Sequence, residues 1–284
     1  MSVFVEQNKT VCNFANSDSW VILTEIEQSI KRKIEAVGTP LKDWDIQINY
    51  GIKTGFNDAF VISTEKRNEI LENCSSEAER VRTEDLIRPI LRGRDIKRYG
   101  YNWADLWLIA TFPSRHYNIE EYPAVKKFLL SFGMERLEQT GKRYVINGEE
   151  VKARKKTSNK WFETQDSISY WEDFDEPKIV WNRIAAIKQF AIADKGIYIQ
   201  DSMHFITGSN LNYLISVLNS KIIQWLLSLI IGEAAGGNAG NADNIWNLCI
   251  PKIDIDQAIT DLDLYSFYGL TTDEAKYIES KVNY

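Results

Sequence analysis

The sequence predicts a mixed α/β (α+β) fold, in which a twisted sheet is flanked by helices and followed by a C-terminal helical portion. The 284 residues are 44% hydrophobic and 26% charged, which is typical of a globular protein with a sizeable core. Segments with the spacing of strands alternate with segments that have the spacing of helices. The long apolar stretch near the C-terminus has helical spacing throughout.

The first elements follow from this spacing. Apolar residues at helical intervals predict an amphipathic helix over 19–37, which a glycine and a proline end. Alternation predicts a half-buried strand over 46–50, and the glycine-containing segment 51–63 predicts a turn and a second strand. A short helix is expected over 65–71.

The middle of the chain contains both kinds of spacing. Two apolar runs, 106–112 and 178–185, predict buried strands, and between them 122–140 predicts a long helix with a basic outer face. The segment 189–208 is typical of a meander, with a hairpin turn at 194–196.

The C-terminal part is predicted to be mainly helical. Apolar residues over 211–229 predict one long helix or a kinked pair, whose apolar stripe packs on the sheet; this stripe contains Leu214, Leu218, Trp225 and Leu229. The small polar residues of 232–243 predict a loop, which we expect to become ordered against DNA or a partner. A strand-like segment over 245–250 and a capped helix over 273–282 complete the prediction.

Charge is unevenly distributed along the chain. The formal net charge is −6, yet residues 80–98 carry a local charge of +4 and the residues from 126 to 160 carry +6. From Asp243 onward the local charge is −5. Such a distribution is compatible with one face that meets a polyanion, and equally with solvated helix faces.

Several classes of chemistry are excluded. The three cysteines and two histidines lack the spacing of a zinc site or a disulfide framework. The sequence contains no glycine-rich phosphate loop, and no Asn/Asp-Pro-Pro-aromatic tetrapeptide of the kind that holds a flipped base in amino-methyltransferases. We therefore expect no metal and no cofactor in this chain. Because the longest apolar run, 222–231, is too short to span a bilayer, we expect a cytoplasmic protein without a membrane partner.

Two stretches combine basic and aromatic residues. Tyr99, Tyr101 and Trp103 follow a group of four cations, and the run KARKKTSNKWF at 152–162 repeats the combination. Arginine and lysine contact phosphates and guanine, while tyrosine and tryptophan position or stack, so the mixture is typical of DNA-binding surfaces. Each pair taken alone is also typical of an aliphatic stem packed on an aromatic ring.

The order of motifs resembles a known family. The set runs GIKTGFNDAFVI, DLIRPILRGRDIKRYGY, EYPAVKKFLLSFGMERLEQT, EPKIVWNRIA, GIYIQDSMHFITG, YLISVLNSKIIQWLLSLI and YSFYGLTTDEAKYIES. It is similar to the TaqI-like C-terminal specificity domain, the target-recognition part of type IIG restriction-modification enzymes and of related adenine-N6 DNA methyltransferases. The resemblance covers nearly the whole chain.

The resemblance implies a module that recognises a short double-stranded DNA sequence and presents a target adenine to a methyltransferase, and in some cases a nuclease, domain or partner. Both catalytic parts are missing from this sequence, so the chain alone is not expected to be an enzyme. S-adenosylmethionine and Mg²⁺ are expected only for those parts.

Within this interpretation the predicted parts are an N-terminal helical lead-in (1–40), a target-recognition domain (41–250) and a C-terminal helical tail packed on it (251–284). The candidate DNA contacts are Arg92, Arg94, Lys97, Arg98, Arg143, Lys152, Arg154, Lys155, Lys156 and Lys160.

Two other interpretations stay open. In the first, the chain is a metal-dependent DNA endonuclease in which Asp166 or Asp173 precedes the Glu-x-Lys triplet of Glu176 and Lys178, and Asp166 is the preferred candidate; such triplets are frequent by chance. In the second, it is a protein-interaction subunit whose acidic C-terminal part binds a partner and whose basic stretches are only solvated.

Overall fold

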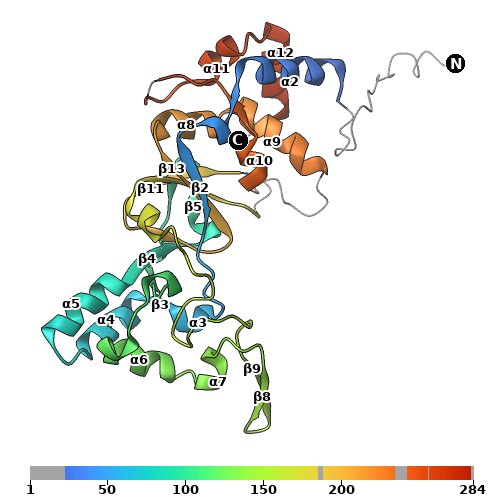
Figure 1. Cartoon of the computed structure of the whole chain (residues 1–284). Coiled ribbons are helices and arrows are strands. Elements are labelled where there is room, and N and C mark those ends of the chain that lie inside the picture. Colours follow the sequence, from blue (N-terminus) through green and yellow to red (C-terminus); the bar gives the residue numbers. More distant parts are fainter. Residues whose placement is uncertain (1–22, 185–187, 234–241, 255, 283–284) are drawn as a thin grey trace.

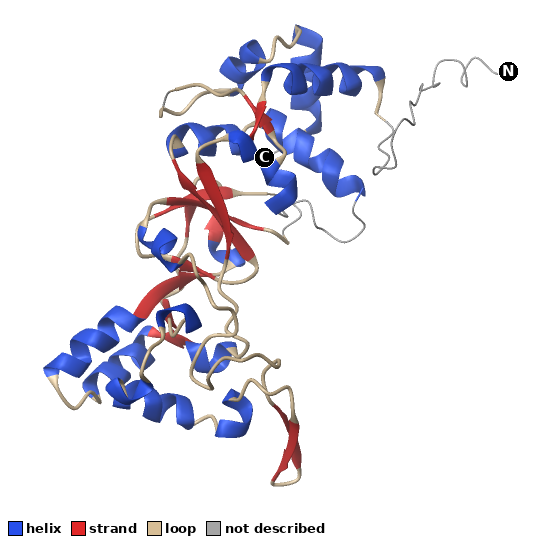
Figure 2. Cartoon of the chain, viewed as in Figure 1, coloured by secondary structure: helices blue, strands red, loops and turns tan. Residues whose placement is uncertain are grey.

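Two four-stranded sheets lie between two groups of helices in the computed structural model, which describes residues 23–184, 188–233, 242–254 and 256–282. The described part is elongated, with one helical group at each end and the sheets between them (Figures 1 and 2). The predicted mixed fold of sheet and flanking helices is confirmed.

The central sheet has the antiparallel order β11-β10-β13-β2. Its strands are β2 (Ile46–Tyr50), β10 (Lys178–Asn182), β11 (Phe190–Ala193) and β13 (Met203–Gly208). The predicted strands at 46–50 and 178–185 are therefore present, the second ending at Asn182.

Strands β10 and β13 of this sheet are buried on both faces, because a separate core packs on each. Val180 and Phe205 face one core, whereas Ile179, Trp181 and Ile206 face the other. A strand that is buried on both sides needs apolar residues at successive positions, which explains why β10 and β13 lack polar alternation.

The second sheet carries one helical group and has the order β12-β4-β7-β3. Its strands are β3 (Val61–Ser63), β4 (Ile87–Leu91), β7 (Leu106–Ile109) and β12 (Tyr198–Ile199). The helices near it are α3 (Asn57–Phe60), α4 (Thr64–Glu72), α5 (Glu77–Leu86), α6 (Pro123–Leu130) and α7 (Met134–Leu137).

The other helical group combines N-terminal and C-terminal elements. It contains α2 (Glu25–Val37), α8 (Leu211–Leu218), α9 (Lys221–Glu233), α10 (Ala242–Trp246), α11 (Asp261–Phe267) and α12 (Thr272–Lys281), with β1 (Thr39–Pro40) paired to β14 (Cys249–Ile250). An ion pair of 2.6 Å between Lys33 Nζ and Glu274 Oε2 joins α2 to α12. Within the described ranges, no helix is both long enough and apolar enough to cross a membrane.

Four sequence predictions need correction. The long helix expected over 122–140 is divided into α6 and α7 by Gly133, whose φ of 85° is not helical. The expected meander does not form, because β11 pairs with β10 while β12 pairs in parallel with β4 in the other sheet. The segment 245–250, predicted to be strand-like, begins inside helix α10. The start of the loop predicted at 232–243 is helical, because Glu233 belongs to α9. Most of the loop predicted at 232–243 lies outside the described residues.

The predicted helix pair over 211–229 is confirmed as α8 and α9, and the final helix as α12, which Thr271 caps. Of the helix expected over 19–37, the described part starts after Thr24 in a capping box with Glu27.

A hairpin that the spacing did not predict projects from the α3–α7 end of the molecule (Figure 1). It consists of β8 (Arg143–Ile146) and β9 (Glu149–Lys152). The two residues between them, Asn147 and Gly148, both have positive φ, at 52° and 85°. An Asn-Gly dipeptide with two positive φ angles is typical of a type I′ turn.

Gly51 lies where the chain passes from β2 toward the second sheet, and substituting it tests that crossing. A Cβ at this position would lie 1.8 Å from the carbonyl oxygen of Gln200, and the amide of Gly51 donates to Met203 O at 2.9 Å. We expect Gly51→Ala to lower the free energy of unfolding by about 1–3 kcal/mol through overpacking. Denaturant titration checks this value, with Gly100→Ala as control because a Cβ there meets no atom within 4 Å. Equal stability of the two variants would contradict the expectation.

Candidate nucleic-acid interface

The first predicted cation group, at 92–98, is partly structural. Arg92 Nη2 donates to Asp95 Oδ1 at 2.8 Å, and this hydrogen bond raises the pKa of Arg92. Arg98 Nη2 donates to the carbonyl of Asn219 at 2.8 Å, at the junction of α8 and α9. Arg94 and Lys97 are exposed. The two exposed cations are therefore the members of this group that solvent reaches most freely.

Arg154 is buried, with 4% of its surface exposed. Its guanidinium donates to four backbone carbonyls, those of Thr54, Leu137, Trp161 and Glu163. Burial lowers the pKa of Arg154 to about 10, and the neighbouring Glu163 acts in the opposite direction, so the side chain is charged at neutral pH. The guanidinium of Arg154 thus joins these loops, and its contact with DNA stays a prediction.

A hollow of about 270 Å³ lies directly beside Arg154, and we call it the cationic hollow. It is lined by Gly55, Phe56, Arg136, Lys152, Ala153, Arg154 and Lys155, so every charged side chain in its lining is positive. Arg136 comes from α7, where its guanidinium lies 4.9 Å from the centre of the Phe56 ring, and Lys152 ends strand β9. The hollow is thus built where the β8–β9 hairpin returns to the body of the protein.

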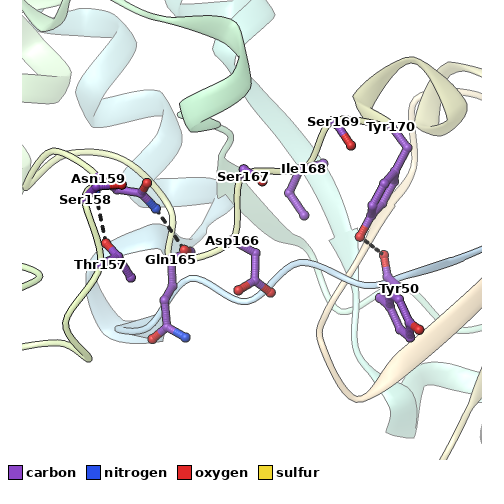
Figure 3. Close-up of a pocket in the computed structure, with 10 residues that line it drawn as sticks. All are labelled: Tyr50, Thr157, Ser158, Asn159, Gln165, Asp166, Ser167, Ile168, Ser169 and Tyr170. Atoms are coloured by element: carbon purple, nitrogen blue, oxygen red, sulfur yellow. Dashed lines mark hydrogen bonds between the residues drawn. The ribbon is translucent and has the colours of Figure 1, made fainter.

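A second, larger hollow of about 580 Å³ is lined mainly by polar side chains, and we call it the polar pocket. Its lining, shown in Figure 3, is Tyr50, Thr157, Ser158, Asn159, Gln165, Asp166, Ser167, Ile168, Ser169 and Tyr170. Asn159 links the lining segment 157–159 to the segment that begins at Thr164, because its Nδ2 donates to the carbonyls of Thr164 at 3.2 Å and Gln165 at 2.9 Å.

Tyr50 and Tyr170 line one part of the polar pocket, and His204 packs behind Tyr50. Tyr170 donates its hydroxyl to the carbonyl of Tyr50 at 3.2 Å, and burial raises the pKa of Tyr170 to about 12. Tyr50 is 57% exposed, and its ring packs edge-on against His204, with 5.0 Å between ring centres. Burial lowers the pKa of His204 to about 4, so this histidine is a neutral packing group at physiological pH.

The cationic hollow and the polar pocket are neighbours. Gly55 lines the first, and a Cβ on it would lie 2.9 Å from Oε1 of Gln165, which lines the second. The φ of Gly55 is +78°, a conformation that glycine adopts without strain. Lys155 of the hollow and Lys53 also interact electrostatically with Asp166 of the pocket. Positive and polar groups therefore meet on one continuous surface.

The remaining predicted cations lie near this surface with different partners. Arg143 Nη1 forms an ion pair of 2.9 Å with Glu150 across the hairpin, and Lys160 Nζ lies 4.0 Å from Glu163. Lys156 is exposed. Two contributors, Lys53 and Arg136, were absent from the predicted set, since they are far in sequence from the 152–160 run.

The endonuclease alternative has no assembled site among the described residues. Lys178 is buried and donates its Nζ to the carbonyls of Phe174 at 2.8 Å and Asp194 at 3.1 Å. Glu176 instead lies 3.5 Å from Lys195 at the surface, and Asp166 lines the polar pocket. Over the part of the chain that the structure covers, no three acidic, histidine or cysteine side chains are grouped to hold a metal ion.

Comparison with known proteins gives a family and two similar structures. None of the curated proteins matches the chain. The type IIL restriction-modification enzyme MmeI, solved in complex with DNA, is 14% identical, with a TM-score of 0.46 over 74% of this chain and 25% of its own. The type IIG restriction endonuclease BpuSI is also 14% identical, with a TM-score of 0.49 over 89% of this chain and 28% of its own. The chain thus spans about a quarter of the length of these enzymes.

The family model of the TaqI-like C-terminal specificity domain matches residues 88–237. This range holds every predicted cation, together with Arg136 of the cationic hollow and all of the polar pocket except Tyr50. Because the match covers more than half of the sequence, the chain belongs to the family of TaqI-like C-terminal specificity domains.

Proposed function

We propose that this chain is the sequence-specific DNA recognition module of a restriction-modification system. The observation that carries the proposal is the cationic hollow, whose charged lining is entirely positive and which adjoins a pocket of polar side chains. A phosphate of the DNA backbone fits a hollow of cations, and such contacts fix the position of a protein on the duplex. Family membership supports the same role.

In the complete system, the module presents a target adenine to a methyltransferase domain or partner, and a nuclease completes the restriction activity. S-adenosylmethionine and Mg²⁺ belong to those catalytic parts in this proposal. The compartment is the cytoplasm, where such systems meet DNA.

The electrostatics of the chain set the expected strength of binding. Arg136, Lys152 and Lys155 attract phosphate locally, whereas the whole chain carries a formal charge of −6. Local attraction to phosphate is therefore opposed by the net negative charge of the whole chain. We expect weak affinity that falls steeply with salt, because bound phosphates release their counterions.

Replacing Arg136, Lys152 and Lys155 together with alanine tests the proposal. We expect the slope of log affinity against log salt to become flatter by about 0.9 for each phosphate contact that is lost. Fluorescence anisotropy with a labelled duplex over a salt series measures the slope. The matched control replaces Lys31, Arg32 and Lys276, three exposed cations on α2 and α12, and should leave the slope unchanged.

An unchanged slope in the first variant would exclude the cationic hollow as a phosphate site. Absence of binding by the unaltered chain at low salt would instead favour the protein-interaction alternative.

A further inference from the structure

Phosphate contacts carry no sequence information, so a DNA-recognition surface needs other groups that reach the edges of the bases. Next to the cationic hollow, the polar pocket contains one acidic side chain, that of Asp166. An acid on a surface for DNA opposes phosphate binding, and its presence there calls for a specific role.

Nothing in the described fold uses the carboxylate of Asp166. Its side chain is exposed, and among the described residues no donor forms a hydrogen bond with it. Desolvation raises its pKa, while Lys53 and Lys155 lower it and Asp201 raises it further. Neither lysine lies close enough to form an ion pair within the described structure. The carboxylate is therefore available to a ligand.

The backbone around this carboxylate is held in place. The amides of Gln165 and Asp166 both donate to the carbonyl of Lys53, at 3.0 and 3.3 Å, and the hydroxyl of Thr164 donates to the carbonyl of Asp166 at 3.0 Å. Figure 3 shows the side chains of Gln165 and Asp166 extending to the same side of the segment. A group on a fixed backbone is suited to recognition, since little freedom is lost when it binds.

The chemistry of the major groove indicates what such a group would recognise. A carboxylate only accepts hydrogen bonds, and the donors in this groove are the exocyclic amino groups of cytosine and adenine. Guanine and thymine present the acceptors O6 and O4 there, which a carboxylate repels.

We propose that Asp166 is a specificity-determining residue, which accepts a hydrogen bond from the exocyclic amino group of a cytosine or adenine while the adjacent cationic hollow holds a backbone phosphate. The side-chain amide of Gln165 lies beside it and reads the same or the next base pair. This inference rests on the proposed function and adds to it the group that reads sequence.

The test is selection of duplexes from a randomised library by the 284-residue chain, followed by sequencing and by competition binding. We expect cytosine or adenine to be preferred at one position. In Asp166→Asn the new amide both donates and accepts, so guanine or thymine becomes acceptable, and the preference there should fall by roughly tenfold.

Asp201→Asn is the matched control, because Asp201 is an exposed acid that interacts electrostatically with Asp166 but does not line the pocket. It removes the same charge nearby and should select the same sequence as the unaltered chain. Equal melting temperatures of the three proteins establish that all are folded.

The outcomes separate the inference from the proposed function. If the unaltered chain binds duplexes without preference, or if Asp166→Asn keeps the preference unchanged, Asp166 does not read a base although DNA binding stands. If the unaltered chain binds no duplex in low salt, the proposed function fails and the inference fails with it.

Discussion

Replacing Arg154 with alanine is expected to lower the free energy of unfolding by about 4 kcal/mol or more, because each of four carbonyls that loses its partner costs roughly 1–3 kcal/mol. The guanidinium donates to the carbonyls of Thr54, Leu137, Trp161 and Glu163, and lies 4.9 Å from the Phe60 ring centre. Chemical denaturation followed by circular dichroism measures the change.

Arg136→Ala is the control for this experiment, since Arg136 lines the same hollow but is exposed. Its effect should stay within about 0.5 kcal/mol, as for most surface substitutions. If the two variants were equally stable, Arg154 would not be the link between these loops.

Trp225→Ala is expected to destabilise the protein by about 3–5 kcal/mol, the usual cost of emptying a large buried site. Trp225 is 1% exposed and belongs to the core that α8, α9, α11 and the central sheet share. The apolar stripe of α9 is therefore a packing face, as its spacing predicted, and the melting temperature should fall accordingly.

Leu262→Ala on α11 serves as the control, because 74% of Leu262 is exposed in the same helical group. It should change the stability by no more than about 0.5 kcal/mol. An unmoved melting temperature for Trp225→Ala would mean that the α9 stripe is an exposed docking surface instead.

The sequence predicted those elements that are marked by a regular spacing of apolar residues or by capping residues within the same segment. Strands β2 and β10 and helices α4, α8, α9 and α12 follow from apolar spacing and caps. The departure of β12 to the other sheet was not predictable, because it depends on pairing with Ile90 and Leu91, more than 100 residues away in the chain. Local spacing carries no information about such a partner.

The candidate site could be predicted only in part, again because its members are decided by contacts between distant segments. The run that contains Arg154 and Lys155 shows adjacent cations, yet the fold buries the first and exposes the second. Local charge cannot distinguish them, since tertiary contacts decide which side chain turns inward. Lys53 and Arg136 join the same surface from distant segments. The run of cations therefore indicated a surface that binds anions, but only the fold shows which residues form that surface.

The central sheet, with a core on each face, also determines how the molecule loses its structure. Residues of β10 pack into one core with Val180 and into the other with Ile179 and Trp181. Loss of the helices on either side would leave one apolar face of the same strands exposed to water, at a cost to both ends. We therefore expect the molecule, despite its elongated shape, to unfold as a single cooperative unit.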